Sequence, residues 1–222
     1  MIVQKKDEMI KFFSKVYLWM FIGMIVSGLM AYYTSVTPSM LTFVSRNFYF
    51  IIIAELITVI AFSAFLKKIN SSGAKALFII YAIINGLTLS SIFIVYKLGS
   101  IVLVFGATAI LFGSLAAYGY ITKQDLTSLG KMMFFGLIAI IITSLVNLFL
   151  NSTAINYVVG IVSIMVFLGL TAWDMQKLKK IYNSCSSKED INKIAIFGAL
   201  ELYLDFINLF LNLLRFFGQD ND

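Results

Sequence analysis

Long apolar runs separated by short polar segments dominate the chain. A helix that crosses the hydrocarbon core of a bilayer needs about 20 mostly apolar residues. We expect seven such helices, near residues 16–33, 48–66, 76–96, 99–121, 132–150, 155–176 and 194–217. The pattern predicts an all-α integral membrane protein, built as a single domain over residues 1–222 with a cytoplasmic N-terminal segment at residues 1–15.

One boundary depends on a turn signal rather than on charge. The stretch from Met132 to Trp173 carries no charged residue and is too long for one spanning helix. The polar sequence "NST" at residues 151–153 is the natural place for a turn between two helices. Proline occurs once, at Pro38, so the other helices have no proline to interrupt them.

Composition and charge support the same class. The chain is 60% hydrophobic and 13% charged, whereas about a quarter of the residues of a soluble domain are charged. The net charge of +6 does not indicate nucleic-acid binding, because the basic residues lie in alternate short loops. These are Lys5, Lys6, Lys11 and Lys15, then Lys67, Lys68 and Lys75, then Lys123 and Lys131, then Lys177, Lys179, Lys180, Lys188 and Lys193.

The opposite loops hold only Arg46 and Lys97. Because cytoplasmic loops are enriched in Lys and Arg, this asymmetry predicts a cytoplasmic N-terminus. Seven crossings would then place the C-terminal "GQDND" outside, whereas a re-entrant last helix would leave it inside. The lone cysteine, Cys185, excludes an internal disulfide and a paired-cysteine metal site.

The last apolar run, "ALELYLDFINLFLNLLRFFG", contains a seam of polar residues. Its members recur at spacings of 4, 3, 4 and 3, which place them on one face of a helix: Glu201, Asp205, Asn208, Asn212 and Arg215. A charge that faces lipid at the bilayer centre costs at least ~2.5–3.5 kcal/mol. The seam must therefore face other helices or water. We expect the last helix to be central, with the other six around it.

The seam residues differ in their expected roles. Asn208 and Asn212 fit hydrogen bonds to neighbouring helices. Arg215, near the helix end, fits a cation that reaches the interface or matches the helix dipole. Asp205 lies deep in the apolar run, where a carboxylate must find a cation, take up a proton or bind an ion.

Two further acids lie within or beside apolar runs. Asp174 lies near the cytoplasmic end of the sixth span, and a cytoplasmic loop joins this span to the last helix. Asp174 and Asp205 can therefore face each other on antiparallel helices; alternatively, Asp174 pairs with Lys177 or Lys180 at the interface. Glu55 lies in the middle of the second span and must also face inward, either as a functional acid or through a structural hydrogen bond.

The chain contains no histidine. A response to pH between about 5 and 8 must then come mainly from carboxyl groups. Two close carboxyls in a site of low dielectric share a proton and titrate as a pair. Carboxylate oxygens are also ligands that suit Ca²⁺. The sequence therefore predicts a proton-sensitive gate or cation site at Asp174 and Asp205, without any other cofactor.

Four segments resemble the Bax inhibitor-1 family of transmembrane proteins, especially its small bacterial members. The most specific is "YLDFINLFLNLLRFFG" in the last helix. The others are "NGLTLSSIF" (85–93), "YGYITKQDLTSLGKMMFFGL" (118–137) and "TAWDMQ" (171–176), so the resemblance runs from about residue 16 to residue 218.

The resemblance implies seven helices around a central last helix. It also implies a pH-sensitive calcium leak controlled by a hydrogen-bonded aspartate pair, which falls on Asp174 and Asp205. The family's acid in the second helix matches Glu55. Some members carry an arginine that latches the pair; Lys67 stands nearest here, and lysine cannot make the bidentate contact of arginine. The chain also has Ser91 where proline is frequent and Trp173 where tyrosine is usual.

Three functions follow as hypotheses. The first is a calcium or general cation leak gated by protonation. The second is a regulatory, stress-protecting membrane protein that acts through partners such as a membrane protease. The third is a proton-coupled carrier. An enzyme is not expected, because intramembrane aspartyl proteases carry Gly-x-Gly-Asp whereas "LYL" precedes Asp205. The resemblance implies a bacterial plasma membrane.

Overall fold

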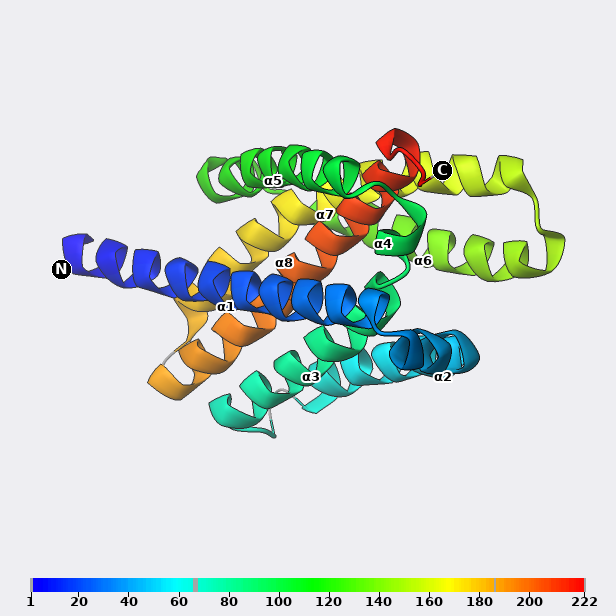
Figure 1. Ribbon diagram of the computed structural model, residues 1–222. Helices are drawn as coiled ribbons and strands as arrows, with labels where there is room; N and C mark the ends of the chain where they lie inside the picture. Colours follow the sequence, from blue (N-terminus) through cyan, green and yellow to red (C-terminus); the bar gives the residue numbers. More distant parts are fainter. Residues whose placement is uncertain (1, 66–67, 186, 222) are drawn as a thin grey trace. The chain divides into compact units, whose positions relative to one another are not determined.

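The computed structural model describes residues 2–65, 68–185 and 187–221. Eight helices follow one another along the chain (Figure 1): α1 Ile2–Val36, α2 Pro38–Phe65, α3 Ser71–Leu89, α4 Ile92–Val95, α5 Leu98–Ile121, α6 Thr127–Leu150, α7 Thr153–Ser184 and α8 Lys188–Phe217. With α3 and α4 counted as one span, the described residues form seven helices long and apolar enough to cross a membrane. The prediction of an all-α integral membrane protein is confirmed.

The helices extend past the apolar runs that predicted them. α7 continues to Ser184, beyond the expected end at residue 176, and α8 begins at Lys188 rather than at residue 194. α1 likewise includes residues 2–15. Lys, Gln and Glu are good helix formers, so a helix can leave the hydrocarbon region without losing its backbone hydrogen bonds. Hydropathy marks the part of a helix that lies in lipid, not the whole helix.

Two spans are locally irregular. α2 is kinked at Asn47, whose backbone is not helical (φ −112°, ψ 16°); its side chain donates to the Phe43 carbonyl (2.8 Å), which satisfies an acceptor near the kink. The span expected over residues 76–96 is divided between α3 and α4. There the amides of Ser90 and Ser91 bond three residues back, to Leu87 and Thr88, which is the tighter 3₁₀ pattern.

The chain divides into two compact units. Unit 1 comprises Met1–Lys97, Ile181–Tyr203 and Asp220–Asp222, and unit 2 comprises Leu98–Lys180 and Leu204–Gln219. Unit 1 therefore contains α1 to α4, the end of α7 and the first half of α8. Unit 2 contains α5, α6, most of α7 and the second half of α8. The single-domain organisation stays a prediction.

Aromatic side chains hold the first half of α8 within unit 1. The Tyr203 ring lies edge-on to those of Phe78 and Tyr81 on α3, with 5.9 Å between centroids in each pair. The Phe197 ring stacks on that of Phe62 on α2 at 6.2 Å. Aromatic side chains bury large areas and favour such edge-on and stacked arrangements. The first half of α8 therefore packs directly against α2 and α3.

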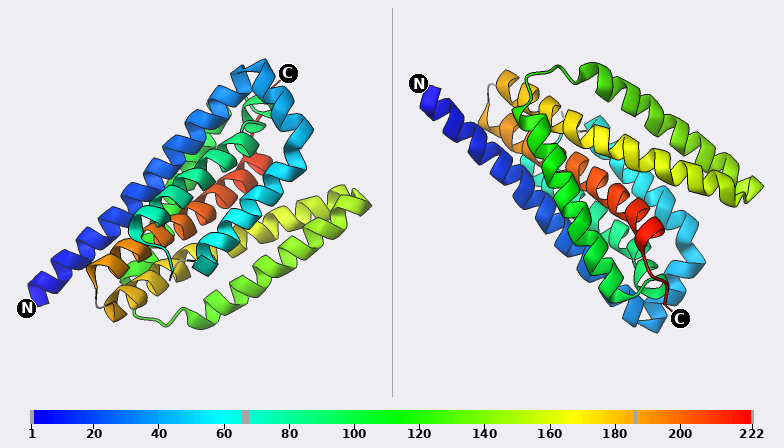
Figure 2. Two further views of the ribbon diagram at one scale, coloured as in Figure 1. Left: turned by 90° about the horizontal axis from the view of Figure 1, so that it is seen from below. Right: turned by 90° about the horizontal axis from the view of Figure 1, so that it is seen from above.

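Aromatic contacts also hold the second half of α8, within unit 2. The Phe206 ring lies 5.0 Å from that of Phe105 and 5.5 Å from that of Phe112, both on α5. The Phe216 ring meets that of Tyr157 on α7 at 5.1 Å. α6 and α7 run side by side as a hairpin (Figure 2). In each unit α8 is thus packed by neighbouring helices; its place among all six others stays a prediction.

The C-terminal tail is attached to the segment between α4 and α5. The Asn221 amide donates to the Val95 carbonyl (2.8 Å), and its side chain donates to the carbonyls of Ile94 (3.0 Å) and Tyr96 (3.1 Å). Three spans separate this segment from the N-terminus. This attachment agrees with seven crossings; the side of the membrane on which the tail lies stays a prediction.

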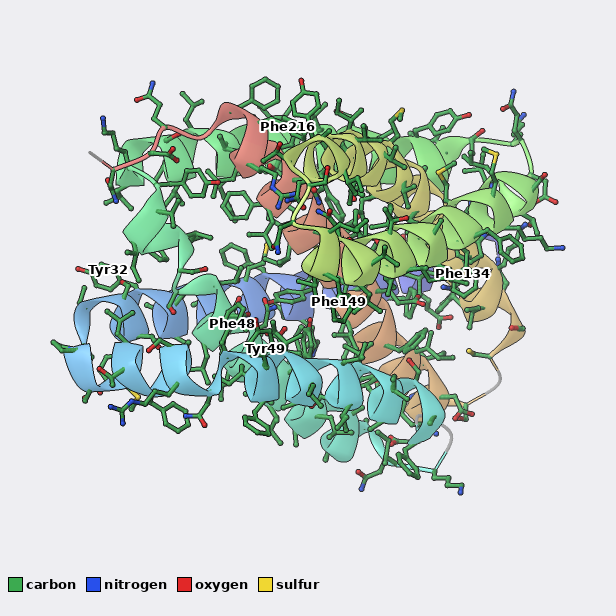
Figure 3. The ribbon with its side chains drawn as sticks, turned by 90° about the vertical axis from the view of Figure 1, so that its right-hand side faces the viewer. Tyr32, Phe48, Tyr49, Phe134, Phe149 and Phe216 are labelled. Carbon is green, nitrogen blue, oxygen red and sulfur yellow. The ribbon has the colours of Figure 1, made fainter. Side chains whose placement is uncertain are left out.

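Large apolar side chains cover the outside of α6. Phe134 is 51% exposed and Phe149 is 88% exposed; Figure 3 labels both. In α6 the buried residues are Gly130 and Asn147. A surface of this kind would drive aggregation in water, but lipid tails are as apolar as these side chains. We therefore assign the outer face of α6 to lipid.

Candidate functional site

Asp174 of α7 and Asp205 of α8 meet inside unit 2. Their side chains are buried, with residue exposures of 6% and 4%, and the two carboxyl groups are hydrogen-bonded to each other. An ionised carboxylate only accepts hydrogen bonds, so this contact requires a proton on one of the two. The structure therefore brings the two predicted acids together; that they share a proton and form a gate stays a prediction.

A cation stands beside the pair. Lys177 Nζ lies 2.8 Å from Asp174 Oδ1 and 4.7 Å from the centroid of the Trp173 ring. The interfacial alternative for Asp174 is thus also correct, because Asp174 contacts both Asp205 and Lys177. Lys180 points elsewhere, to Asp125 at 2.6 Å. The Lys177 ammonium balances the one negative charge that a singly protonated pair carries.

Two glycines let α7 approach its neighbours closely at this level. A Cβ on Gly119 of α5 would overlap the Ala172 carbonyl, and a Cβ on Gly130 of α6 would overlap the Trp173 indole. Ala172 and Trp173 immediately precede Asp174. Because interiors are close-packed, such contacts leave little room for α7 to turn about its axis. The backbone that carries Asp174 is therefore held on the α5 side and on the α6 side.

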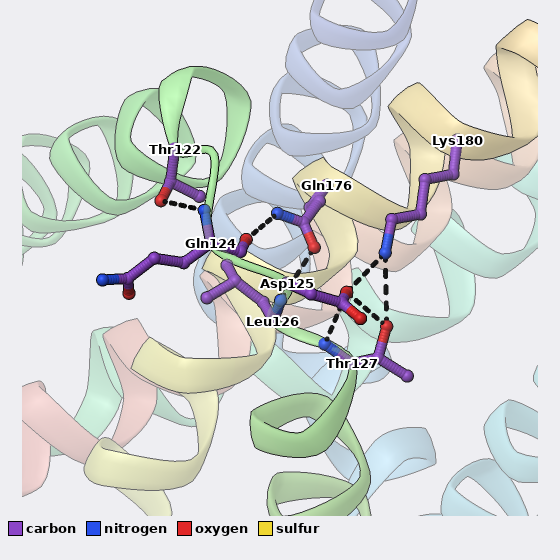
Figure 4. A network of polar contacts seen from close by, with 7 residues as sticks. All are labelled: Thr122, Gln124, Asp125, Leu126, Thr127, Gln176 and Lys180. Atoms are coloured by element: carbon purple, nitrogen blue, oxygen red, sulfur yellow. Dashed lines mark hydrogen bonds and ion pairs between the residues drawn. The ribbon is translucent and has the colours of Figure 1, made fainter.

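The α5–α6 connection holds the next turn of α7 (Figure 4). The Gln176 side chain is buried; its Oε1 accepts from the Leu126 amide (2.9 Å) and its Nε2 donates to the Gln124 carbonyl (2.7 Å). Lys180 donates to Asp125 (2.6 Å) and to the Thr127 hydroxyl (3.2 Å). Residues 118–137 and 171–176, two segments that the sequence analysis noted separately, thus contact each other directly.

Asp125 lies at the exposed end of this network. Hydrogen bonds from Lys180 and from Thr127 hold the pKa of its carboxyl at about 2. The Asp125–Lys180 ion pair is consequently complete throughout the range between pH 5 and 8. Sequence reasoning gave neither Gln176 nor this loop a role, although both lie within segments that resemble the family. The sequence signal was Gln176 itself, an amide side chain two residues after Asp174, between Met175 and Lys177.

Glu55 belongs to a separate network in unit 1. Its Oε1 accepts from Thr88 Oγ1 (2.7 Å) and from Asn85 Nδ2 (3.2 Å). Asn85 Oδ1 in turn accepts from the Tyr203 hydroxyl (2.7 Å). These bonds join α2, α3 and α8. The structural alternative for Glu55, a hydrogen bond to another helix, is confirmed.

The remaining seam residues have ordinary surroundings. Asn208 Nδ2 donates to the Leu204 carbonyl and Asn212 Nδ2 to the Asn208 carbonyl, both at 2.8 Å. These donors stay on α8 itself, so the expected bonds to neighbouring helices are wrong for them. An amide can satisfy a carbonyl one turn back without leaving its helix. Arg215 is exposed near the helix end and reaches the Asn156 carbonyl at 3.5 Å.

Two other predicted residues complete the set. Glu201 is half-buried and lies in unit 1, one turn before Asp205. Lys67, the expected substitute for an arginine latch, lies outside the described residues. Within the described ranges, no group of three or more His, Cys, Asp or Glu side chains could hold a metal ion. The pair alone offers four carboxyl oxygens, whereas Ca²⁺ takes about 6–8 ligands.

Comparisons with known proteins agree with this picture. Residues 9–222 match the family model described as inhibitor of apoptosis-promoting Bax1. The inner membrane protein YbhL of Escherichia coli K12 is 43% identical over 98% of this chain and 95% of its own length. An uncharacterised protein of Borreliella burgdorferi is 43% identical over 98% of this chain and 97% of its own. One from Rickettsia prowazekii, RP147, is 39% identical over 96% and 91%.

Proposed function

Because the chain belongs to the Bax inhibitor-1 family and is a multi-pass bacterial membrane protein, we propose that it is a pH-sensitive calcium leak. The Asp174–Asp205 pair is its gate, and Ca²⁺ or another cation is the permeant ion rather than a resident cofactor. The proposal involves no catalysis. The observation that carries it is the contact between two buried carboxyls on two membrane-crossing helices.

Charge explains how such a pair responds to pH. With one proton, a carboxyl donates to a carboxylate, and charge-assisted bonds of this kind are about twice as strong as neutral ones. The remaining negative charge also attracts Lys177, 2.8 Å from Asp174. A second proton removes both attractions at once. Acidification therefore loosens the contact between α7 and α8 within unit 2 and biases the pair toward a separated state.

The side of the membrane follows from the lysine distribution. A cytoplasmic N-terminus places the α5–α6 connection and the end of α7 on the cytoplasmic side. Asp174 lies one turn before Lys177 and two turns before Lys180, which is exposed. The pair would then lie near the cytoplasmic surface and sense cytoplasmic pH.

The test is Ca²⁺ entry into proteoliposomes that contain the purified protein, measured between pH 5 and 8. We expect a leak that rises as the pH falls, and a flux in Asp174→Asn and in Asp205→Asn that no longer follows pH. Empty vesicles and a folded-state check by circular dichroism are the controls. Folded protein that gives no flux above empty vesicles at any pH would overturn the proposal. Saturable uptake of one solute driven by a proton gradient would instead indicate a carrier.

A second candidate is a regulatory membrane protein that acts through a partner such as a membrane protease. α6 favours it, because its buried residues are Gly130 and Asn147, and a face that meets lipid is the face on which a membrane helix of another protein would replace lipid. Retention of a partner by wild-type protein, and its loss when Phe134 and Phe135 are replaced by alanine without a change in flux, would support this role. Retention that is unchanged by these substitutions would count against it.

A further inference from the structure

The polar contacts of Gln176 have a consequence for the aspartate pair. Gln176 lies two residues after Asp174 on α7, which is 200° around the helix at 100° per residue. The two side chains therefore leave opposite sides of α7. Gln176 reaches the backbone of the α5–α6 connection, and Asp174 reaches Asp205 of α8. Any turn of α7 about its axis that breaks one contact strains the other.

We propose that Gln176 is a positioning residue, which fixes the rotation of α7 and so sets the geometry and titration of the Asp174–Asp205 pair. The α5–α6 connection then acts as a cytoplasmic anchor that controls the gate from outside it. This inference deepens the proposed function and rests on it for the gating role alone. The positioning itself concerns the pair and can be measured without any flux.

The Gln176 contact is suited to this role because it is double and buried. One amide group satisfies a backbone donor at 2.9 Å and a backbone acceptor at 2.7 Å. Leaving such groups unsatisfied in a buried place is costly, so the amide holds its position firmly. Both partners are main-chain groups of residues 124–126, whose position does not depend on a side-chain rotamer. The Lys180–Asp125 pair on the same connection is exposed, and such pairs contribute little.

The geometry is sensitive to small rotations. The outer radius of a helix with its side chains is about 5 Å, so a turn of about 20° moves a surface atom by about 2 Å. A hydrogen bond between two oxygens holds over only about 0.5 Å of distance. Loss of the Gln176 contact can therefore uncouple the carboxyls even though Asp174 itself is unchanged. The close approaches of Ala172 to Gly119 and of Trp173 to Gly130 limit rotation just before Asp174, and the Gln176 contact adds the restraint just after it.

Several charged and titratable groups surround the pair. Lys177 approaches Asp174 from α7, and Asp205 belongs to α8. On the following turn Lys179 donates to the Tyr120 carbonyl of α5 (2.9 Å), and Lys180 turns to Asp125. Because the Asp125 carboxyl has a pKa of about 2, it keeps its charge between pH 5 and 8. A titration in this range that responds to Gln176 therefore reports the pair and not the loop.

The experiment compares Gln176→Met with wild type by infrared difference spectroscopy, following the protonated carboxyl band as pH is changed. Asp174→Asn and Asp205→Asn identify the band. We expect the two titration steps of the pair to move closer together by about half to one pH unit in Gln176→Met. Separation weakens both the shared hydrogen bond and the repulsion between the carboxylates, and these keep the steps apart. Lys180→Gln removes another contact of α7 with the same connection, the exposed pair with Asp125, and should leave the interval between the two steps unchanged.

The same variants are then tested for Ca²⁺ entry in proteoliposomes. If wild type conducts and Gln176→Met broadens or shifts the pH profile, both the positioning and the gating role are supported. If no protein conducts but the infrared interval still narrows, the positioning stands and the leak fails. An unchanged interval in folded Gln176→Met overturns the positioning role. Should Gln176→Met not fold, Gln176→Asn keeps the amide but shortens its reach, and the same outcomes apply to it.

Discussion

Nζ of Lys177 lies 2.8 Å from Oδ1 of Asp174, one turn earlier on the same helix. The cation thus stands beside a carboxyl that is already hydrogen-bonded to a second carboxyl. Two carboxyls and one ammonium therefore lie together within one turn of α7 and one turn of α8, and their net charge depends on how many protons the carboxyls carry. A change of pH alters the net charge of these three groups.

Replacing Lys177 by glutamine should change the pH dependence of the leak. The ammonium opposes protonation of the pair, so the acid-induced rise in flux should begin about one pH unit higher without it. Lys179→Gln is the matched control, because Lys179 bonds to the Tyr120 carbonyl instead. Calcium flux at intervals of half a pH unit measures the effect. Equal shifts in both variants would mean that general surface charge, and not the Asp174 contact, is responsible.

Gly119→Ala should destabilise the protein, whereas Gly106→Ala on the same helix should not. A Cβ on Gly119 would overlap the Ala172 carbonyl, but a Cβ on Gly106 would meet nothing within 4 Å. Overpacking costs about 1–3 kcal/mol, while alanine in place of an unhindered helical glycine adds up to about 1 kcal/mol of stability. Thermal unfolding in detergent separates the two. Similar melting temperatures for both variants would contradict the close approach of α5 and α7.

Asp125→Asn should lower the melting temperature slightly at pH 7 and leave the pH dependence of the leak unchanged. The folded-state pKa of Asp125 is about 2, below its ordinary value of 3.8. Its stabilising effect is therefore complete above about pH 4 and is lost as the pH falls through about 2. Melting curves of both proteins should converge over that interval. A flux profile altered between pH 5 and 8 would show that Asp125 takes part in gating.

Glu55→Ala should destabilise unit 1 without removing the pH response. Its loss would leave Asn85 Nδ2 without this acceptor, whereas the Thr88 hydroxyl would keep the Asn85 carbonyl (2.8 Å); an unsatisfied buried group costs about 1–3 kcal/mol. Glu55→Gln retains an acceptor oxygen and should be milder. Denaturation and flux are measured together on both variants. A wild-type melting temperature accompanied by a flattened pH profile would assign Glu55 to the gate instead of to the framework.

Hydropathy predicted the spans well because lipid solvation is a property that each residue contributes nearly independently. The inward orientation of Asp205 also followed from the cost of placing a charge in lipid. The ends of α7 and α8 did not follow, because polar helix formers such as Lys180 and Lys188 continue a helix beyond its apolar run. The kink at Asn47 depends on a side-chain bond to a carbonyl, which a hydropathy pattern does not contain.

The two acids of the candidate site could be predicted from the sequence. The contacts that position them could not. Asp174 and Asp205 stand out as carboxyls within or beside apolar runs, and their meeting follows from helices joined by one loop. The role of Gln176 depends on two main-chain groups of the α5–α6 connection. The sequence shows Gln176 as a polar residue next to Asp174, but backbone partners leave no residue-type signature, so the pattern of side chains does not show what Gln176 contacts. The asparagines of α8 were misjudged for a related reason, since their own helix offers acceptors.

The most direct test of the central claim is a double-mutant cycle on the pair. Calcium entry is measured from pH 5 to 8 in wild type, Asp174→Asn, Asp205→Asn and the double variant. If the two carboxyls act as one proton-sharing unit, each single variant should lose the pH dependence completely, and the double variant should match them. Single variants that each retain part of the response, with effects that add in the double variant, would contradict the account.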